Sequence, residues 1–152
     1  MKNYSIKQLL HKKCLEYAEQ RISTIQKAID EAIESANDDT KSSSGDKHET
    51  GRAMAQLEQE KSSKQLSEAI EFRNALEKIS PEQRSETILL GSMVHTDNGS
   101  FYISVAAGKL IIDGQTFFAI SPTSPLALKM IGLGTGSQIS FNGNNYKITE
   151  VV

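Results

Sequence analysis

Apolar residues recur along the N-terminal half of the chain at alternating intervals of three and four positions. The series begins at Leu15 and ends at Ala36. This spacing is typical of the a and d positions of a coiled coil. Charged residues fill the other faces, and neither Gly nor Pro interrupts residues 5–37, so we predict one long helix there. The series consists of Leu15, Ala18, Ile22, Ile25, Ile29, Ala32 and Ala36.

A second helical pattern follows a short polar stretch. Residues 37–45 (NDDTKSSSG) are mostly small and polar, which favours turns and helix ends, with Asp38 and Asp39 ending the first helix. The second pattern starts near Asp46 and stops at Pro81, because proline cannot extend the helical hydrogen-bond ladder. Its apolar stripe is looser than the first. It contains Met54, Leu57, Leu66, Ala69, Ile70, Leu76 and Ile79.

Two long amphipathic helices joined by a short polar turn are expected to pack antiparallel, each covering the other's apolar stripe. We therefore predict a projecting coiled-coil hairpin over residues 5–80. The alternative, in which both helices fold back over the C-terminal half, would need a wider apolar face than this Ala-rich stripe provides.

The pattern changes after residue 85 to short runs of β-branched and aromatic residues separated by Gly and Asn, which predicts antiparallel strands. Residues 142–145 (NGNN) are typical of a hairpin turn. The predicted strands are residues 88–90, 101–105, 109–112, 116–120, 138–141 and 146–152.

One short helix is expected between these strands. Ser124 is a suitable N-cap, Pro125 a suitable first helical residue, and Gly132 a suitable stop after an apolar stretch that begins at Leu126. The predicted fold class is α+β. A helical hairpin occupies residues 1–82, with its tip at about 38–49, and a small antiparallel sheet domain with one short helix occupies residues 83–152.

Charge divides the chain in the same way, because residues 1–84 hold 14 of the 17 Lys and Arg and 15 of the 19 Asp and Glu. The net charge of −2 gives no overall positive field, so we expect no independent binding to DNA. No apolar run is long enough for a signal-peptide core or a membrane span, which predicts a cytoplasmic protein without membrane contact. A single cysteine, Cys14, allows no internal disulfide, and the three His do not have zinc-site spacing.

Two carboxylates, Asp46 and Glu49, lie three residues apart where the second helix is expected to start. This spacing has an ordinary interpretation as a capping box, in which Asp46 accepts a backbone N–H and Glu49 reaches back to the cap residue. It also has a functional interpretation, because a hairpin tip can reach into a partner and present acids there. Spacing alone does not choose between them.

A resemblance favours the functional interpretation. Residues 45–49 (GDKHE) resemble the G-D-x-x-E motif of the Gre family of bacterial transcript cleavage factors, and residues 28–32 (AIDEA) resemble the end of that family's first helix. The C-terminal half is similar to that family's C-terminal domain. The similar segments there are residues 91–94 (GSMV), 124–127 (SPLA), 130–132 (MIG) and 146–151 (YKITEV).

The resemblance implies a coiled coil that enters the secondary channel of RNA polymerase and an FKBP-like domain that docks on the rim of that channel, through Ser124, Pro125 and Leu126. Asp46 and Glu49 would help to hold a second Mg²⁺ in the polymerase site, near the 3′ end of backtracked RNA. Carboxylates suit this hard cation, and two-metal cleavage stabilises both the attacking and the leaving oxygen. The chain would then have no cofactor and no turnover of its own.

Two alternatives stay open. Thr50 stands where family members often have Asn, Ala53 stands where they carry an aromatic residue, and residues 38–44 look like extra length before the motif. A Gre-like regulator that occupies the channel without promoting cleavage is therefore a second hypothesis. A third is a prolyl isomerase or chaperone acting through the FKBP-like domain, for which the six aromatic residues after position 85 would have to line a pocket.

Overall fold

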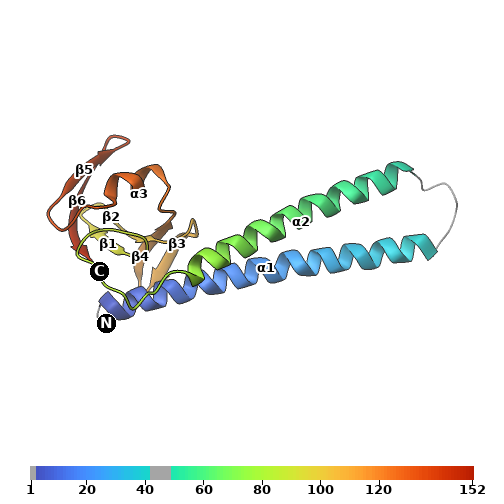
Figure 1. The fold of residues 1–152 in the computed structure, drawn as a ribbon, viewed down its shortest axis with the longest axis horizontal. Helices are drawn as coiled ribbons and strands as arrows, with labels where there is room; N and C mark the ends of the chain where they lie inside the picture. The colour runs from blue at the N-terminus through green and yellow to red at the C-terminus, as the bar shows by residue number, and fades with distance from the viewer. Residues whose placement is uncertain (1–2, 42–48) are drawn as a thin grey trace. The chain divides into compact units, whose positions relative to one another are not determined.

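The computed structural model describes residues 3–41 and 49–152 (Figure 1). Two long helices, α1 (Asn3–Lys41) and α2 (Glu49–Glu77), are packed together and precede a six-stranded sheet with one short helix, α3 (Pro125–Met130). The predicted α+β class is confirmed.

Helix α1 continues to Lys41, four residues beyond the expected end at Asn37. Asp38 and Asp39 are therefore helical and do not end the helix as predicted. Helix propensity is a weak preference, and extending an existing helix by one turn costs far less than starting one. Helix α2 ends at Glu77, before the predicted stop at Pro81.

Contacts divide the chain into two compact units. One contains residues Ala18–Arg73, and the other contains Met1–Tyr17 together with Asn74–Val152. The first four turns of α1 thus belong with the sheet, whereas the rest of α1 pairs with α2. The predicted domain boundary at residues 82 and 83 stays a prediction, because a compact unit need not be a domain that folds alone.

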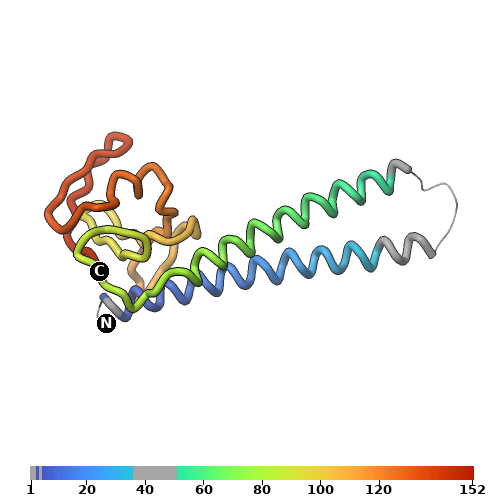
Figure 2. The backbone as a smooth tube through the Cα atoms, in the orientation of Figure 1, coloured from blue at the N-terminus to red at the C-terminus, as the bar shows by residue number. Residues whose placement is uncertain are grey.

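Within residues Ala18–Arg73 the two helices run alongside each other in opposite directions (Figure 2). Ala18 and Ala69 are fully buried, and the Arg21 guanidinium lies 6.0 Å from the centre of the Phe72 ring. Burial of the predicted stripe then decreases along the hairpin. Ile22, Ile25 and Ile29 are half-buried, whereas Met54 and Leu57 of the second stripe are exposed.

The sheet has the strand order β3-β4-β2-β1-β6-β5. Four of its strand pairs are antiparallel, as expected, but β2 and β4 are parallel, so the sheet is mixed. Residues 88–90 do not form the predicted strand, and β1 was not predicted. The strands are β1 (Met93–Thr96), β2 (Gly99–Ile103), β3 (Gly108–Ile112), β4 (Gln115–Ile120), β5 (Gln138–Phe141) and β6 (Asn144–Val151).

Each face of the sheet has its own apolar layer, because successive side chains of a strand point to opposite faces. Val94, Phe101 and Ile103 belong to a core cluster that also contains Ala127 and Met130 of α3. Tyr102 points to the other face, where it contacts His11 of α1. The sheet therefore lies between α3 and the first turns of α1.

Candidate functional site

The predicted acid pair lies at the connection between the long helices. Asp46 is outside the described residues. Glu49 is the first residue of α2, but its side chain is outside the description. The helix bounds place Glu49 in a first helical turn, where backbone N–H groups and the helix dipole favour a carboxylate. The mutual geometry of Asp46 and Glu49 stays a prediction.

The predicted docking residues form the start of α3. Ser124 is the N-cap, with φ −64° and ψ 150°, and its hydroxyl accepts a 3.3 Å hydrogen bond from the Ala127 backbone N–H. Pro125 occupies the first turn, where its missing N–H costs nothing. Leu126 packs against the core cluster, whereas Pro125 is exposed. Local sequence thus fixes α3, and only part of the predicted docking segment is free for a partner.

Further apolar side chains near this segment are exposed. Leu128 is 62% exposed, Ile131 is three residues further on, and Leu89 is also exposed. The Gly132 backbone N–H donates to the Ile88 carbonyl at 2.8 Å, which brings the segment of Leu89 beside that of Ile131. Sequence reasoning missed these exposed side chains, although Leu128 lies on the side of α3 away from the buried Ala127 and Met130.

Helix α1 carries a row of buried polar side chains against the sheet. Lys7 is only 2% exposed, and its ammonium donates to the main-chain oxygens of Gln83 and Val152. His11 Nδ1 lies 2.8 Å from the Tyr102 hydroxyl, and Cys14, one turn further on, is fully buried. The sequence predicted no such row, because Lys and His on a helix are ordinarily solvated.

Burial controls the protonation of this row. It lowers the pKa of His11, against a smaller opposing effect of Glu82, and so favours the neutral imidazole. Burial raises the pKa of the Cys14 thiol to about 11, and also raises the pKa of Tyr102. The three groups are therefore uncharged near neutral pH, which suits a structural role and not acid–base chemistry.

A second histidine lies on the same sheet face. His95 Nδ1 is 2.8 Å from Ser100 Oγ on the neighbouring strand, and burial lowers the pKa of His95 while Glu150 opposes that shift. Ser100 is 8% exposed, so a substrate has little access to its hydroxyl. The pair links β1 to β2.

Within residues 3–41 and 49–152, no group of three or more His, Cys, Asp or Glu side chains is arranged to hold a metal ion. Among the same residues, none of the helices has the length and apolar character needed to cross a membrane.

Most aromatic residues of the sheet are packed in its apolar layers, whereas the prolyl isomerase hypothesis needs them to line a pocket. Phe101, Tyr102, Phe117 and Tyr146 are buried, and Phe101 and Tyr146 belong to the core cluster. Phe118 is partly exposed, but its ring lies against that of Phe101, 6.2 Å between centres. The arrangement favours a packing role for these side chains.

Comparisons with known proteins add little to this description. No family model matches the chain, and no curated protein matches it. One similar solved structure is that of the transcription factor Gfh1, which is 19% identical over 91% of this chain and 92% of its own, with a TM-score of 0.34. A TM-score this low does not establish a shared arrangement of the whole chain.

Proposed function

We propose that this chain is a Gre-type transcription elongation factor that binds RNA polymerase in the cytoplasm and stimulates cleavage of backtracked RNA. It would insert the hairpin of α1 and α2 into the polymerase secondary channel and dock its FKBP-like sheet domain on the channel rim. The chain would be an accessory factor, since the reaction would take place in the polymerase site.

One observation carries this proposal. The G-D-x-x-E motif spans residues 45–49. Helix α1 ends at Lys41, and helix α2 begins at Glu49. The motif is therefore at the connection of an antiparallel helical pair, where the proposed mechanism needs it. The segment from Ser124 to Leu126 supports the docking half of the proposal, because it starts α3, on which Leu128 is an exposed apolar side chain.

The proposed chemistry uses the two carboxylates as metal ligands. Asp46 and Glu49 would contribute oxygens to a Mg²⁺ that polymerase alone holds weakly, and one of them would orient the attacking water. Mg²⁺ commonly takes one or two carboxylates and keeps several waters, so a pair of acids is sufficient. The second ion would stabilise the charge that develops as the phosphodiester bond breaks.

The test is to add the protein to stalled elongation complexes in the presence of Mg²⁺ and to follow RNA length. The proposal predicts short 3′-terminal RNA fragments and a correspondingly shortened transcript. Complexes left unchanged while the protein is shown to bind polymerase would contradict stimulated cleavage.

A second candidate is a Gre-like regulator that occupies the channel without cleavage. It is favoured by Thr50 and Ala53, which depart from the family pattern beside the motif, and by the continuation of α1 through Asp38 and Asp39. This candidate predicts that the protein slows or tunes RNA synthesis and releases no RNA fragments from stalled complexes.

A further inference from the structure

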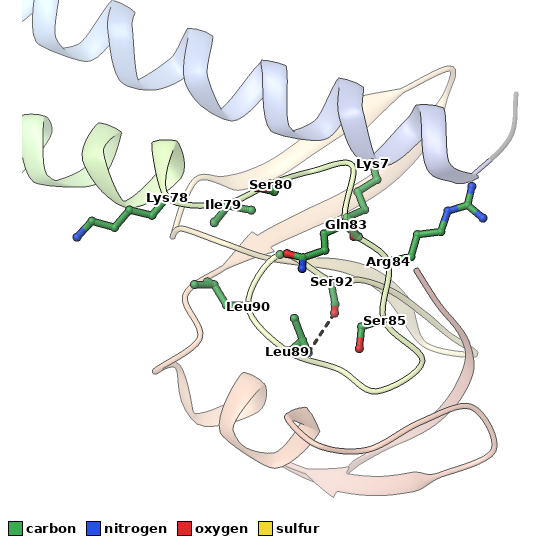
Figure 3. Close-up of a pocket in the computed structure, with 11 residues that line it drawn as sticks. Lys7, Lys78, Ile79, Ser80, Gln83, Arg84, Ser85, Leu89, Leu90 and Ser92 are labelled. Carbon is green, nitrogen blue, oxygen red and sulfur yellow. Dashed lines mark hydrogen bonds between the residues drawn. The ribbon is translucent and has the colours of Figure 1, made fainter.

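A cavity of about 380 Å³ lies between the start of α1 and the segment that runs from the end of α2 into β1 (Figure 3). Its wall includes Lys7, Lys78 and Arg84, together with serine hydroxyls and the backbone near Gly91. Small-molecule sites in proteins begin at about 300 Å³, so this space can hold a small ligand. Nothing in the proposed transcription function uses it.

The cavity wall has three cationic side chains and no Asp or Glu side chain. The positive charges of Lys7 and Arg84 repel each other. Burial lowers the pKa of Lys7 and Arg84 lowers it further, whereas Glu82, which is outside the wall, raises it. An anion in the cavity would relieve this repulsion.

Two buried donors in the wall retain capacity for a ligand. An ammonium group has three N–H donors, and that of Lys7 gives two of them to the main-chain oxygens of Gln83 and Val152. Ser92 is 1% exposed, and its hydroxyl accepts from the Leu89 backbone N–H; among the described residues, no acceptor is recorded for its own proton. In Figure 3 the Ser92 hydroxyl points toward Leu89, within the ring of residues that surrounds the cavity.

Lys78 and Arg84 extend from opposite sides of the cavity wall (Figure 3). Lys78 is an exposed side chain with several rotatable bonds, so its ammonium group can move toward a bound anion. Lys7 and Ser92 would contact the anion at the buried wall, Lys78 would move over it, and the charge of Arg84 would add to the positive potential of the wall.

We propose that this cavity is a binding site for a small phosphate-bearing anion. Ammonium, guanidinium and hydroxyl donors without a competing carboxylate form charge-assisted hydrogen bonds with phosphate oxygens. The site goes beyond the proposed transcription function and does not depend on it. Free inorganic phosphates and the phosphate groups of a nucleotide share this chemistry.

The test is titration of the ¹⁵N-labelled full chain with orthophosphate, pyrophosphate and a nucleoside triphosphate, at constant ionic strength and without divalent cations. We expect saturable shifts of the Leu89, Gly91 and Ser92 amide signals. The anion that binds most tightly identifies the source, because only the nucleotide adds base and sugar contacts. Absence of saturable shifts at these amides with all three anions would overturn the proposal.

A pair of matched variants separates a site from general charge attraction. The double variant Lys78→Gln and Arg84→Gln should weaken binding by about tenfold, because it removes two charges near the anion. The control double variant Lys64→Gln and Lys109→Gln removes the same charge from exposed residues outside the wall and should bind as the unmodified chain does. Equal weakening in both variants would overturn the proposal, and thermal unfolding of each confirms that it folds.

Discussion

The Nδ1 atom of His11 on α1 and the hydroxyl of Tyr102 on β2 lie 2.8 Å apart inside the molecule, with their rings nearly perpendicular at 85°. The two residues are 91 positions apart in the sequence. This contact joins the first turns of α1 to the sheet, and its loss should weaken that packing.

Tyr102→Phe should lower the free energy of unfolding by about 1–3 kcal/mol, because it leaves the buried His11 nitrogen without its partner. Urea unfolding followed by circular dichroism measures the difference. Tyr146→Phe is the matched control, since no hydrogen bond of the Tyr146 hydroxyl is recorded among the described residues, and it should change stability by less than about 0.5 kcal/mol. Equal effects of the two variants would show that the His11 contact contributes nothing.

Stability should decrease as the solution becomes acidic. Burial lowers the folded-state pKa of His11 and of His95, so below the unfolded value of about 6.5 the unfolded chain binds protons that the folded chain does not. The contribution of each histidine is complete above that pH and is lost as pH falls toward its folded-state pKa. Tyr102, Cys14 and Glu82 are the other titratable groups that act on or lie beside His11.

His11→Gln tests this linkage. Unfolding free energies measured between about pH 7.5 and pH 5.5 should depend less steeply on pH in the variant. The difference in slope should correspond to at most one bound proton, and His95→Gln should have a separate effect of the same sign. An unchanged slope in both variants would contradict the assigned burial.

Cys14 should resist alkylation in the folded protein. The side chain is buried, and burial raises the pKa of its thiol to about 11, so both access and thiolate fraction are low. Iodoacetamide at about pH 8 should label the native chain far more slowly than the chain in urea. Fast labelling of the native chain would mean that the first turns of α1 separate readily from the sheet.

Leu128→Asp should weaken binding to RNA polymerase without destabilising the fold, because the side chain is mostly exposed on α3 beside the predicted docking segment. Ile111→Asp is the matched control, since Ile111 is also exposed but lies on β3. Competition binding against the unmodified chain measures both. Equal loss of affinity in the two variants would place the docking surface elsewhere.

Local signals explain why much of the fold was predictable. Helical spacing of apolar residues predicted both long helices, more regularly in the first than in the second. Ser124 followed by Pro125 predicted α3, because an N-cap acts within one turn. Strand β1 was missed because Met93–Thr96 is short and contains His and Thr where an apolar run was expected. The parallel pairing of β2 with β4 joins distant segments, and no local spacing specifies it.

Non-local packing also explains what could not be predicted at the candidate sites. Lys7 and His11 looked like solvated helix residues, but the sheet covers them and supplies hydrogen-bond partners from distant segments. Leu128 could have been predicted to be exposed, because it lies opposite Ala127 and Met130 on a six-residue helix. The functional interpretation of Asp46 and Glu49 rests on the resemblance to the motif. Their spacing alone fits a capping box equally well.

The most direct test of the central claim compares the unmodified chain with the double variant Asp46→Asn and Glu49→Gln on stalled elongation complexes at fixed Mg²⁺. The account predicts that the variant competes with the unmodified chain for polymerase but no longer shortens the RNA. Cleavage by the double variant at the unmodified rate would contradict the claim that these two carboxylates help to hold the metal.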